Sequence, residues 1–427
     1  MVLFFMRGIA AFVLFLGAGT LAWSDGPHYL RWQDVQPLLA AFASSGEKID
    51  IADSAAWSRW TWDRDIAIRG RIDHGIEDSI SALIIFGSSY TTLPRIPSAA
   101  DAVNAAGDLT AKARARLDAF VQALDEQDSD RLSLALEFLR RRRVTLEELR
   151  AFLAGNLRRF AIEGVADQQK QAQGREYTDE GISPEAPFLA NFGIAEALRT
   201  LKTSNAFPAH IRRIAVIGPG LSIAGEAPAY DFCSPQIIQP FAVLEAVLRL
   251  GIASNDVQVT AIDVNPYVLA HLRAAKVHSQ HYTIQLARAT STGWTSTAID
   301  YFAHFGDVIG APATAIPTQS GAEFRAVSVK PQNMTRLNVQ ELNIIVQSPA
   351  AQAFDLVIAT NVLTNYGPFE QGLALANIAT MLSHSGIVVT DGSLPAAKIT
   401  DLEAAGTSFA PFSIDGSGDT LAMYRRK

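Results

Sequence analysis

From about His210 onward, short apolar runs alternate with amphipathic stretches, and this alternation constrains the fold more than any other feature of the chain. Four apolar runs predict strands, at 213–218, 257–264, 354–363 and 387–392. Three stretches have apolar residues at helical spacing, at 241–252, 266–276 and 370–386, and Gly386 would cap the last one. This alternation predicts an α/β domain with a largely parallel sheet, to which 408–414 and 419–427 would add a C-terminal hairpin.

The first half of the chain differs because it predicts helices almost throughout. Residues 25 to about 205 hold several stretches with apolar side chains at helical spacing, and Thr145 with Glu148 forms a capping box. A length of 427 residues suggests two or three domains. We expect a signal peptide or N-terminal anchor at 1–24, a helical domain at 25–165, a linker and lead-in helix at 166–205, and the α/β domain at 206–427.

Composition excludes some classes of protein. The net charge is −7, whereas a dedicated nucleic-acid binder usually has a basic balance, so we expect no nucleic-acid partner. The chain has one cysteine, Cys233, which excludes a disulfide framework and a cysteine-rich zinc site within one chain.

The N-terminus resembles an export signal. One basic residue, Arg7, precedes an apolar stretch from Gly8 to about Leu21, and small residues stand at positions −3 and −1 of a cleavage site after Ser24. The stretch is short for a membrane span. We expect a bacterial protein that is exported to the periplasm or anchored in the membrane by this segment alone, or a cytoplasmic one if translation begins later, at Met6.

Three predicted strands end in residues that suit a ligand, and in open α/β sheets ligands bind at these carboxyl ends. The first ends in Gly218-Pro219-Gly220, where glycines allow a close backbone approach or serve only as a turn. The second ends in Asp263, which could accept hydrogen bonds from ribose hydroxyls; alternatively, Asp263 or Asn265 only caps the following helix. The third ends in Thr360 and Asn361, a polar rim or an ordinary loop.

Other chemistries have weaker support in the sequence. Ile223 stands where a dinucleotide-binding loop has its third glycine, and Asp263 lies too far along the chain for an NAD site. His74, Glu77 and Asp78 have metal-ligand spacing, but a capped helix start explains them better, so we expect no metal.

Taken together, these features resemble the class I S-adenosylmethionine-dependent methyltransferases, and most of all the chemotaxis-receptor glutamate methyltransferases, over residues 205–395. That family has G-E-E-P-Y after its glycine turn, and here stand Gly225-Glu226-Ala227-Pro228 and then Tyr230. Its acid after the second strand is matched by Asp263. The segments "VQELNI" and "FDLVIATNVLTNY" match two further motifs and supply Asn343 and Asn361.

The resemblance implies a Rossmann-like methyltransferase sheet, mostly parallel with a C-terminal antiparallel strand, preceded by an all-α N-terminal domain. It implies S-adenosylmethionine as cofactor. The implied cofactor-binding residues are Gly218 and Gly220 beside the methionine part, Glu226 at its ammonium group, Asp263 at the ribose, Asn343 by the adenosine and Asn361 near the sulfonium.

The chain also departs from that family. Val216 replaces an acid that many methyltransferases carry, Thr360 replaces an arginine, and the family's tyrosine position falls on Asn365, one before Tyr366. The acceptor, a small molecule or a protein, and any catalytic residue are therefore unknown, although Tyr366 could line the acceptor side. Because S-adenosylmethionine is made in the cytoplasm, the alternative is an exported, non-catalytic binding or scaffold protein on this fold.

Overall fold

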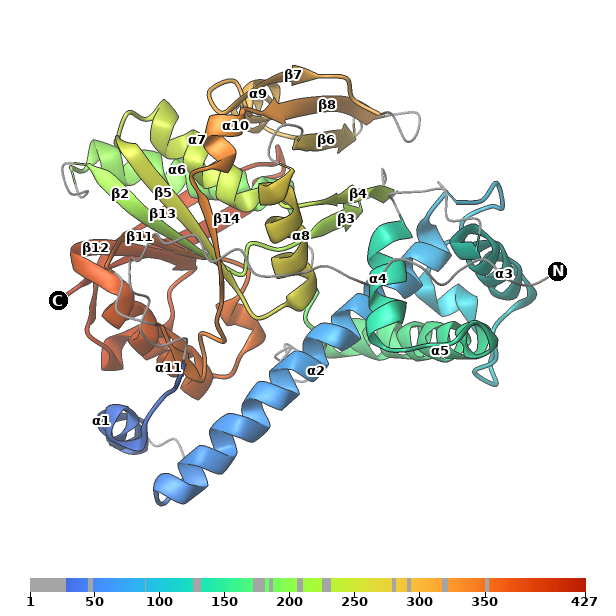
Figure 1. Ribbon diagram of the computed structural model, residues 1–427, viewed down its shortest axis with the longest axis horizontal. Helices are drawn as coiled ribbons and strands as arrows, with labels where there is room; N and C mark the ends of the chain where they lie inside the picture. The colour runs from blue at the N-terminus through green and yellow to red at the C-terminus, as the bar shows by residue number, and fades with distance from the viewer. Residues whose placement is uncertain are drawn as a thin grey trace, which may run out of the picture.

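The computed structural model describes residues 28–44, 49–88, 90–125, 132–171, 181–183, 187–205, 210–224, 232–278, 282–289, 293–316, 322–349 and 353–427. Its helices are α1 (Trp32–Ser44), α2 (Ser54–Phe86), α3 (Ala111–Asp125), α4 (Ser133–Arg141), α5 (Leu146–Gln171), α6 (Phe188–Thr203), α7 (Gln239–Arg249), α8 (Pro266–Val277), α9 (Ser296–His304), α10 (Pro331–Met334) and α11 (Pro368–Met381). Short 3₁₀ turns are η1 (Ala99–Ala102), η3 (Leu363–Asn365) and η4 (Pro395–Ile399). Figure 1 shows the sheet on one side, the helices α3 to α5 on the other, and α2 running between them.

The main sheet has seven strands in the order β13-β14-β12-β11-β2-β5-β9. They are β13 (Leu402–Pro411), β14 (Gly418–Arg426), β12 (Leu382–Asp391), β11 (Phe354–Ala359), β2 (Ile211–Ile217), β5 (Ala253–Asp263) and β9 (Leu337–Glu341). The four pairs from β12 to β9 are parallel, and β14 is antiparallel to both of its neighbours. The predicted α/β, Rossmann-like sheet with a C-terminal antiparallel strand is confirmed.

Strand β2 is the middle one of the five parallel strands, and its side chains are apolar on both faces of the sheet. Ile214 and Val216 belong to the core that α6 and α7 cover, and Ala215 and Ile217 belong to the core that α11 and α1 cover. From β2 the chain moves outward to β5 and β9, and then returns to β11 on the other side of β2. The strand order therefore reverses between β2 and β11, which is where such sheets bind ligands.

Smaller sheets surround the main one. Strands β6 (Thr283–Ala289), β8 (Ala322–Val329) and β7 (Gly310–Ala313) form an antiparallel sheet. These strands come between α8 and β9 along the chain and were not predicted from the sequence. Strands β3 (Ser222–Ala224) and β4 (Phe232–Gln236) pair after the glycine loop. The predicted helix cap at Gly386 is wrong: α11 ends at Met381, and Gly386 lies within β12.

The helical half of the chain is built around α2, which has 33 residues. Its N-cap is Asp53, whose side chain accepts a hydrogen bond from the Ala56 N–H at 2.8 Å. The prediction of a helix start at His74 to Asp78 is therefore wrong, because these residues lie in the middle of α2. The capping box before α5 is confirmed, since the Thr145 N–H donates to Glu148 and the Glu148 N–H donates to Thr145.

The predicted all-α character of the N-terminal region is not confirmed in full. The two-residue strand β1 (His28–Tyr29) pairs with β10 (Gln347–Ser348), so the region adds a strand to the other half of the chain. Helix α6 packs against β13, β14 and α7, and thus covers the main sheet. The domain boundaries remain predictions. Within the described ranges no helix is long and apolar enough to cross a membrane, and residues 1–24 lie outside those ranges.

Candidate functional site

A cavity lies at the carboxyl ends of β2, β5, β9 and β11 and holds about 680 Å³ of space, open solvent included. Five of the six residues that the sequence assigned to a cofactor line it: Gly218, Gly220, Asp263, Asn343 and Asn361. The sixth, Glu226, lies outside the described residues. The structure thus brings five residues from four strand ends to one cavity, and their roles toward a cofactor stay predictions.

The loop after β2 needs glycine at two positions for the same reason, and at Gly218 for a second one. Gly218 and Gly220 both have positive φ, +61° and +72°, which side chains other than glycine rarely adopt. A Cβ at Gly218 would also overlap the Val362 side chain, which follows β11. The glycine therefore lets the loops after β2 and β11 meet and form one continuous wall of the cavity.

Asp263 ends β5 with one carboxylate oxygen in use and the other available. Its Oδ1 accepts the backbone N–H groups of Val264 at 2.7 Å and Asn265 at 2.8 Å. Its Oδ2 accepts no hydrogen bond from the residues that the structure describes, and the carboxylate lines the cavity. Burial raises the pKa of Asp263 to about 7, and the two backbone hydrogen bonds limit that rise. Asn265 itself caps α8, as the alternative interpretation predicted for it.

Asn343 follows β9 and is held firmly by its neighbours. Its Nδ2 donates to Asp65 on α2 at 2.7 Å, and its Oδ1 accepts the Ile345 N–H at 3.1 Å. The residue is only 1% exposed. Asn343 therefore shapes this end of the cavity, and its side-chain carbonyl is already engaged by the protein.

The end of β11 is strained. Asn361 has a φ of +59°, and its backbone N–H donates to the carboxylate of Asp391, the last residue of β12. Burial raises the pKa of Asp391 to about 6, and the nearby charge of Asp419 adds to that rise. Asp391 was not among the predicted site residues. Its position near the end of the apolar run 387–392, just before Gly392, was a visible signal of an acid at a strand end.

Tyr366 lines the cavity as well, and its place on the acceptor side stays a prediction. It is 6% exposed, and burial raises the pKa of its hydroxyl. The Arg71 guanidinium lies over its ring at 5.8 Å and donates to the Asn365 carbonyl at 2.9 Å. Thr360 points elsewhere: it is buried and accepts a hydrogen bond from Gln239 at 3.0 Å.

Two parts of the helical half complete the cavity, and the sequence analysis predicted neither. Ile72 of α2 lines it, as do Ile182 and Ser183. Both halves of the chain thus contribute to one site, because α2 crosses the carboxyl edge of the sheet (Figure 1). No short motif marks these residues, and only the tertiary packing brings them to the site.

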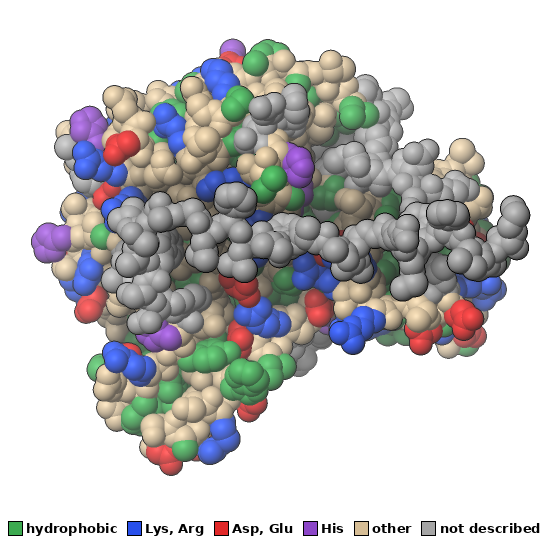
Figure 2. All heavy atoms as spheres, in the orientation of Figure 1, with side chains coloured by type: hydrophobic (Ala, Val, Ile, Leu, Met, Phe, Trp, Pro, Cys, Tyr) green, Lys and Arg blue, Asp and Glu red, His purple; other side chains and the backbone are tan. Residues whose placement is uncertain are grey.

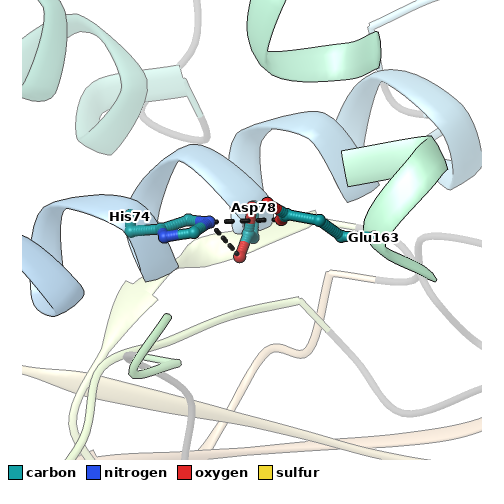
Figure 3. A group of neighbouring side chains, drawn as sticks. All are labelled: His74, Asp78 and Glu163. Carbon is teal, nitrogen blue, oxygen red and sulfur yellow. Dashed lines mark hydrogen bonds and ion pairs between the residues drawn. The ribbon is translucent and has the colours of Figure 1, made fainter. Parts of the chain in front are cut away.

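A separate cluster of titratable groups joins α2 to α5. Figure 3 shows His74, Asp78 and Glu163 pointing toward one another, and their ligand atoms lie within 4.8 Å of each other. Arg159 contacts all three, at 2.9 Å from both Asp78 and Glu163 and closely beside the His74 ring. A metal ion would have to displace this guanidinium. Burial raises the pKa of Asp78, and Arg159 opposes that rise.

The described surface mixes both signs of charge. Figure 2 shows Lys and Arg side chains interspersed with Asp and Glu over the face in view.

On α2, Trp62 and Ile66 are 57% and 55% exposed, whereas Trp57 is 1% exposed and stacks on Trp60 at 5.1 Å. Trp57 and Trp60 therefore pack together, whereas Trp62 is exposed.

The chain matches no protein-family model and no curated protein. Among solved structures it is similar to N-methyltransferase NodS from Bradyrhizobium japonicum WM9 in complex with S-adenosyl-L-homocysteine, at 14% identity over 60% of this chain and 97% of NodS, with a TM-score of 0.31. A TehB-like SAM-dependent methyltransferase from Corynebacterium glutamicum gives 13% identity over 56% of this chain and 98% of its own, with a TM-score of 0.27. The [4+2]-cyclase SpnF gives 10% identity over 54% and 80%, with a TM-score of 0.28. Scores this low carry no argument about activity.

Proposed function

We propose that this chain binds S-adenosylmethionine in the cavity at the carboxyl edge of its main sheet and transfers the methyl group to an acceptor. One observation carries the proposal. Residues assigned to this cofactor from four separate sequence motifs, 143 positions apart at the extremes (218 to 361), line a single cavity. The reversal of strand order beside β2 puts that cavity where α/β sheets bind nucleotide-like ligands.

The donor groups fit the cofactor. S-adenosylmethionine carries a ribose diol, and Asp263 offers an accessible carboxylate oxygen that no described residue uses. Gly218 and Gly220 present a backbone without side chains, which allows the methionine part to pass close to the loop. Ile217, Ile262 and Leu342 add apolar surface suited to the flat adenine ring.

The bound cofactor would supply a methyl group that its sulfonium already activates, so the protein has mainly to align donor and acceptor. Asn361 and Tyr366 line the cavity, and the resemblance assigns Asn361 to the sulfonium end, where the acceptor would approach. No residue is assigned as a catalytic base. The acceptor is left open, and the glutamate acceptor of the chemotaxis enzymes is not part of the proposal.

The proposal is tested by thermal denaturation of the full chain with a panel of ligands. We expect S-adenosylmethionine and S-adenosylhomocysteine to raise the melting temperature, because a ligand that binds only the folded state stabilises it by RT ln(1 + [L]/Kd). NAD should have no effect. Stabilisation by NAD but not by S-adenosylhomocysteine would contradict the proposal.

If ligand binds, Glu226→Ala should weaken it, since the resemblance assigns Glu226 to the ammonium group. The matched control is Asp256→Ala, which removes an exposed acid from the early part of β5, the strand that ends in Asp263. Affinity should remain unchanged in this control.

A further inference from the structure

A short segment of the chain, 181–183, lies directly on a glycine in the middle of α2. The Ile182 N–H donates to the Arg71 carbonyl at 2.9 Å, although Arg71 is a residue of the helix itself. A Cβ at Gly75 would overlap the Ile182 carbonyl group, and a Cβ at Gly181 would lie 2.9 Å from the Gly75 nitrogen. Backbone therefore packs on backbone here, which only a glycine allows.

Gly75 lowers the stability of α2 unless the contact with residues 181–183 compensates for it. Glycine in a helix interior is less favourable than alanine because it loses more backbone entropy on folding. The same helix contains a second glycine, Gly70, whose missing Cβ would meet nothing within 4 Å. Gly70 and Gly75 both lie inside α2, but Gly70 is exposed, whereas Gly75 is buried and has a segment seated on it.

The segment also reaches the cavity. Ile182 and Ser183 line it together with Ile72, which lies one turn before Gly75 on α2. Ile182 packs against the hydrophobic core that includes Ile217, Ile262 and Tyr366, and these three side chains line the cavity as well. The segment therefore forms part of the cavity wall beside Ile72 of α2.

We propose that residues 181–183 form the closing wall of the cofactor cavity, that Gly75 is its seat on α2, and that bound ligand leaves only when this segment lifts off. Gly75 is then a positioning residue, because it acts through Ile182. This inference rests on the proposed function in one respect, namely that the ligand is S-adenosylmethionine or its product.

The experiment compares Gly75→Ala with Gly70→Ala in the full chain. Hydrogen exchange measures the Ile182 amide without any ligand. This amide should exchange at least about tenfold faster in Gly75→Ala than in the wild type, because the Arg71 hydrogen bond is lost, and at the wild-type rate in Gly70→Ala. Stopped-flow dissociation of S-adenosylhomocysteine should likewise be about tenfold faster in Gly75→Ala and unchanged in Gly70→Ala.

A second variant keeps the inference testable if Gly75→Ala misfolds. Ile182→Ala removes the side chain that covers the cavity and leaves the backbone contact intact. Dissociation should be faster in this variant, while exchange at position 182 stays slow. General destabilisation would lower the melting temperature of the ligand-free variant and accelerate amide exchange throughout the chain. Loss of the covering side chain alone should do neither.

The outcomes separate the two proposals. Equal amide exchange in Gly75→Ala and Gly70→Ala would overturn the seat on Gly75. Ligand binding by the wild type with the same dissociation rate in all three variants would overturn the closing wall and leave the proposed function standing. Failure of the wild type to bind the ligand would overturn the proposed function and the closing wall together, while the seat on Gly75 would still be decided by exchange.

Discussion

Asn343 and Asp65 form a buried hydrogen bond of 2.7 Å between side chains that are 278 residues apart. Asn343 follows β9 at the cavity and Asp65 belongs to α2, so the bond ties the helical half of the chain to the carboxyl edge of the sheet. Asp65 also accepts the Tyr29 hydroxyl at 2.9 Å, and both carboxylate oxygens are therefore in use. Helix α2 is in this way part of the architecture of the site.

Asp65→Ala should destabilise the protein by about 2–3 kcal/mol, because it leaves the buried amide of Asn343 without its charged partner. The control is Asp34→Ala, which removes an exposed acid that pairs with Arg31 at the surface and should change stability by less than about 1 kcal/mol. Urea denaturation measures both. Equal losses in the two variants would show that the bond between Asn343 and Asp65 has no special weight.

Gly218→Ala should destabilise the protein by about 2–4 kcal/mol, since it combines a strained φ with overlap against Val362. Gly251→Ala has a similar φ of +64° and open space around it, so it isolates the cost of the backbone conformation, about 1 kcal/mol. Truncating Val362 to alanine in the Gly218→Ala background should recover part of the difference. No recovery would mean that the overlap is relieved in another way.

Asp263→Asn should stabilise the ligand-free protein at pH 8 by about 1–3 kcal/mol while weakening ligand binding. The folded pKa of about 7 lies above the ordinary value of 3.8. Between these values the folded state holds a proton that the unfolded state has released, so stability falls as pH rises toward 7. The asparagine variant lacks this loss and keeps an acceptor for the two backbone N–H groups.

The advantage of Asp263→Asn should accordingly be small near pH 4 and largest above pH 7. Denaturation curves at pH 4, 6 and 8 give the comparison. Asp391, which has a pKa of about 6, contributes in the same sense to both proteins and cancels in the difference. A variant that is less stable than the wild type at pH 8 would refute the argument from burial.

Arg159→Met should destabilise the protein at pH 8 because the carboxylates of Glu77, Asp78 and Glu163 lose their shared cation. The loss should be smaller near pH 4, because burial raises the pKa of Asp78 and a larger share of this carboxylate is protonated there. We also expect the variant to be stabilised by millimolar Zn²⁺ while the wild type is not, because methionine vacates the position of the guanidinium among His74, Asp78 and Glu163. Equal zinc stabilisation of both proteins would show that Arg159 does not block the cluster.

The sequence predicted the strands of the main sheet well, because β2, β5, β11 and β12 are short apolar runs that each end in a glycine or a polar residue. The site could be predicted to the same extent. Gly218, Asp263 and Asn361 follow directly from those strand ends, and parallel strands bring their carboxyl ends to one edge.

What the sequence did not show depends on packing between distant parts of the chain. The helix start expected at His74 was wrong because α2 continues through Gly75, whose role is a close backbone contact that has no sequence signal. The antiparallel sheet of β6, β8 and β7 was missed although β6 and β8 alternate apolar and polar residues over much of their length, so a signal for these strands was present in the sequence. Ile72 and Ile182 reach the site only through the path of α2, which local patterns do not reveal.

Calorimetric titration of the full chain with S-adenosylhomocysteine tests the central claim most directly. We predict binding of one ligand per chain, a loss of affinity of about tenfold or more in Asp263→Ala, and unchanged affinity in Asp256→Ala. Absence of measurable heat for the wild type, together with an unchanged melting temperature at millimolar ligand, would contradict the account.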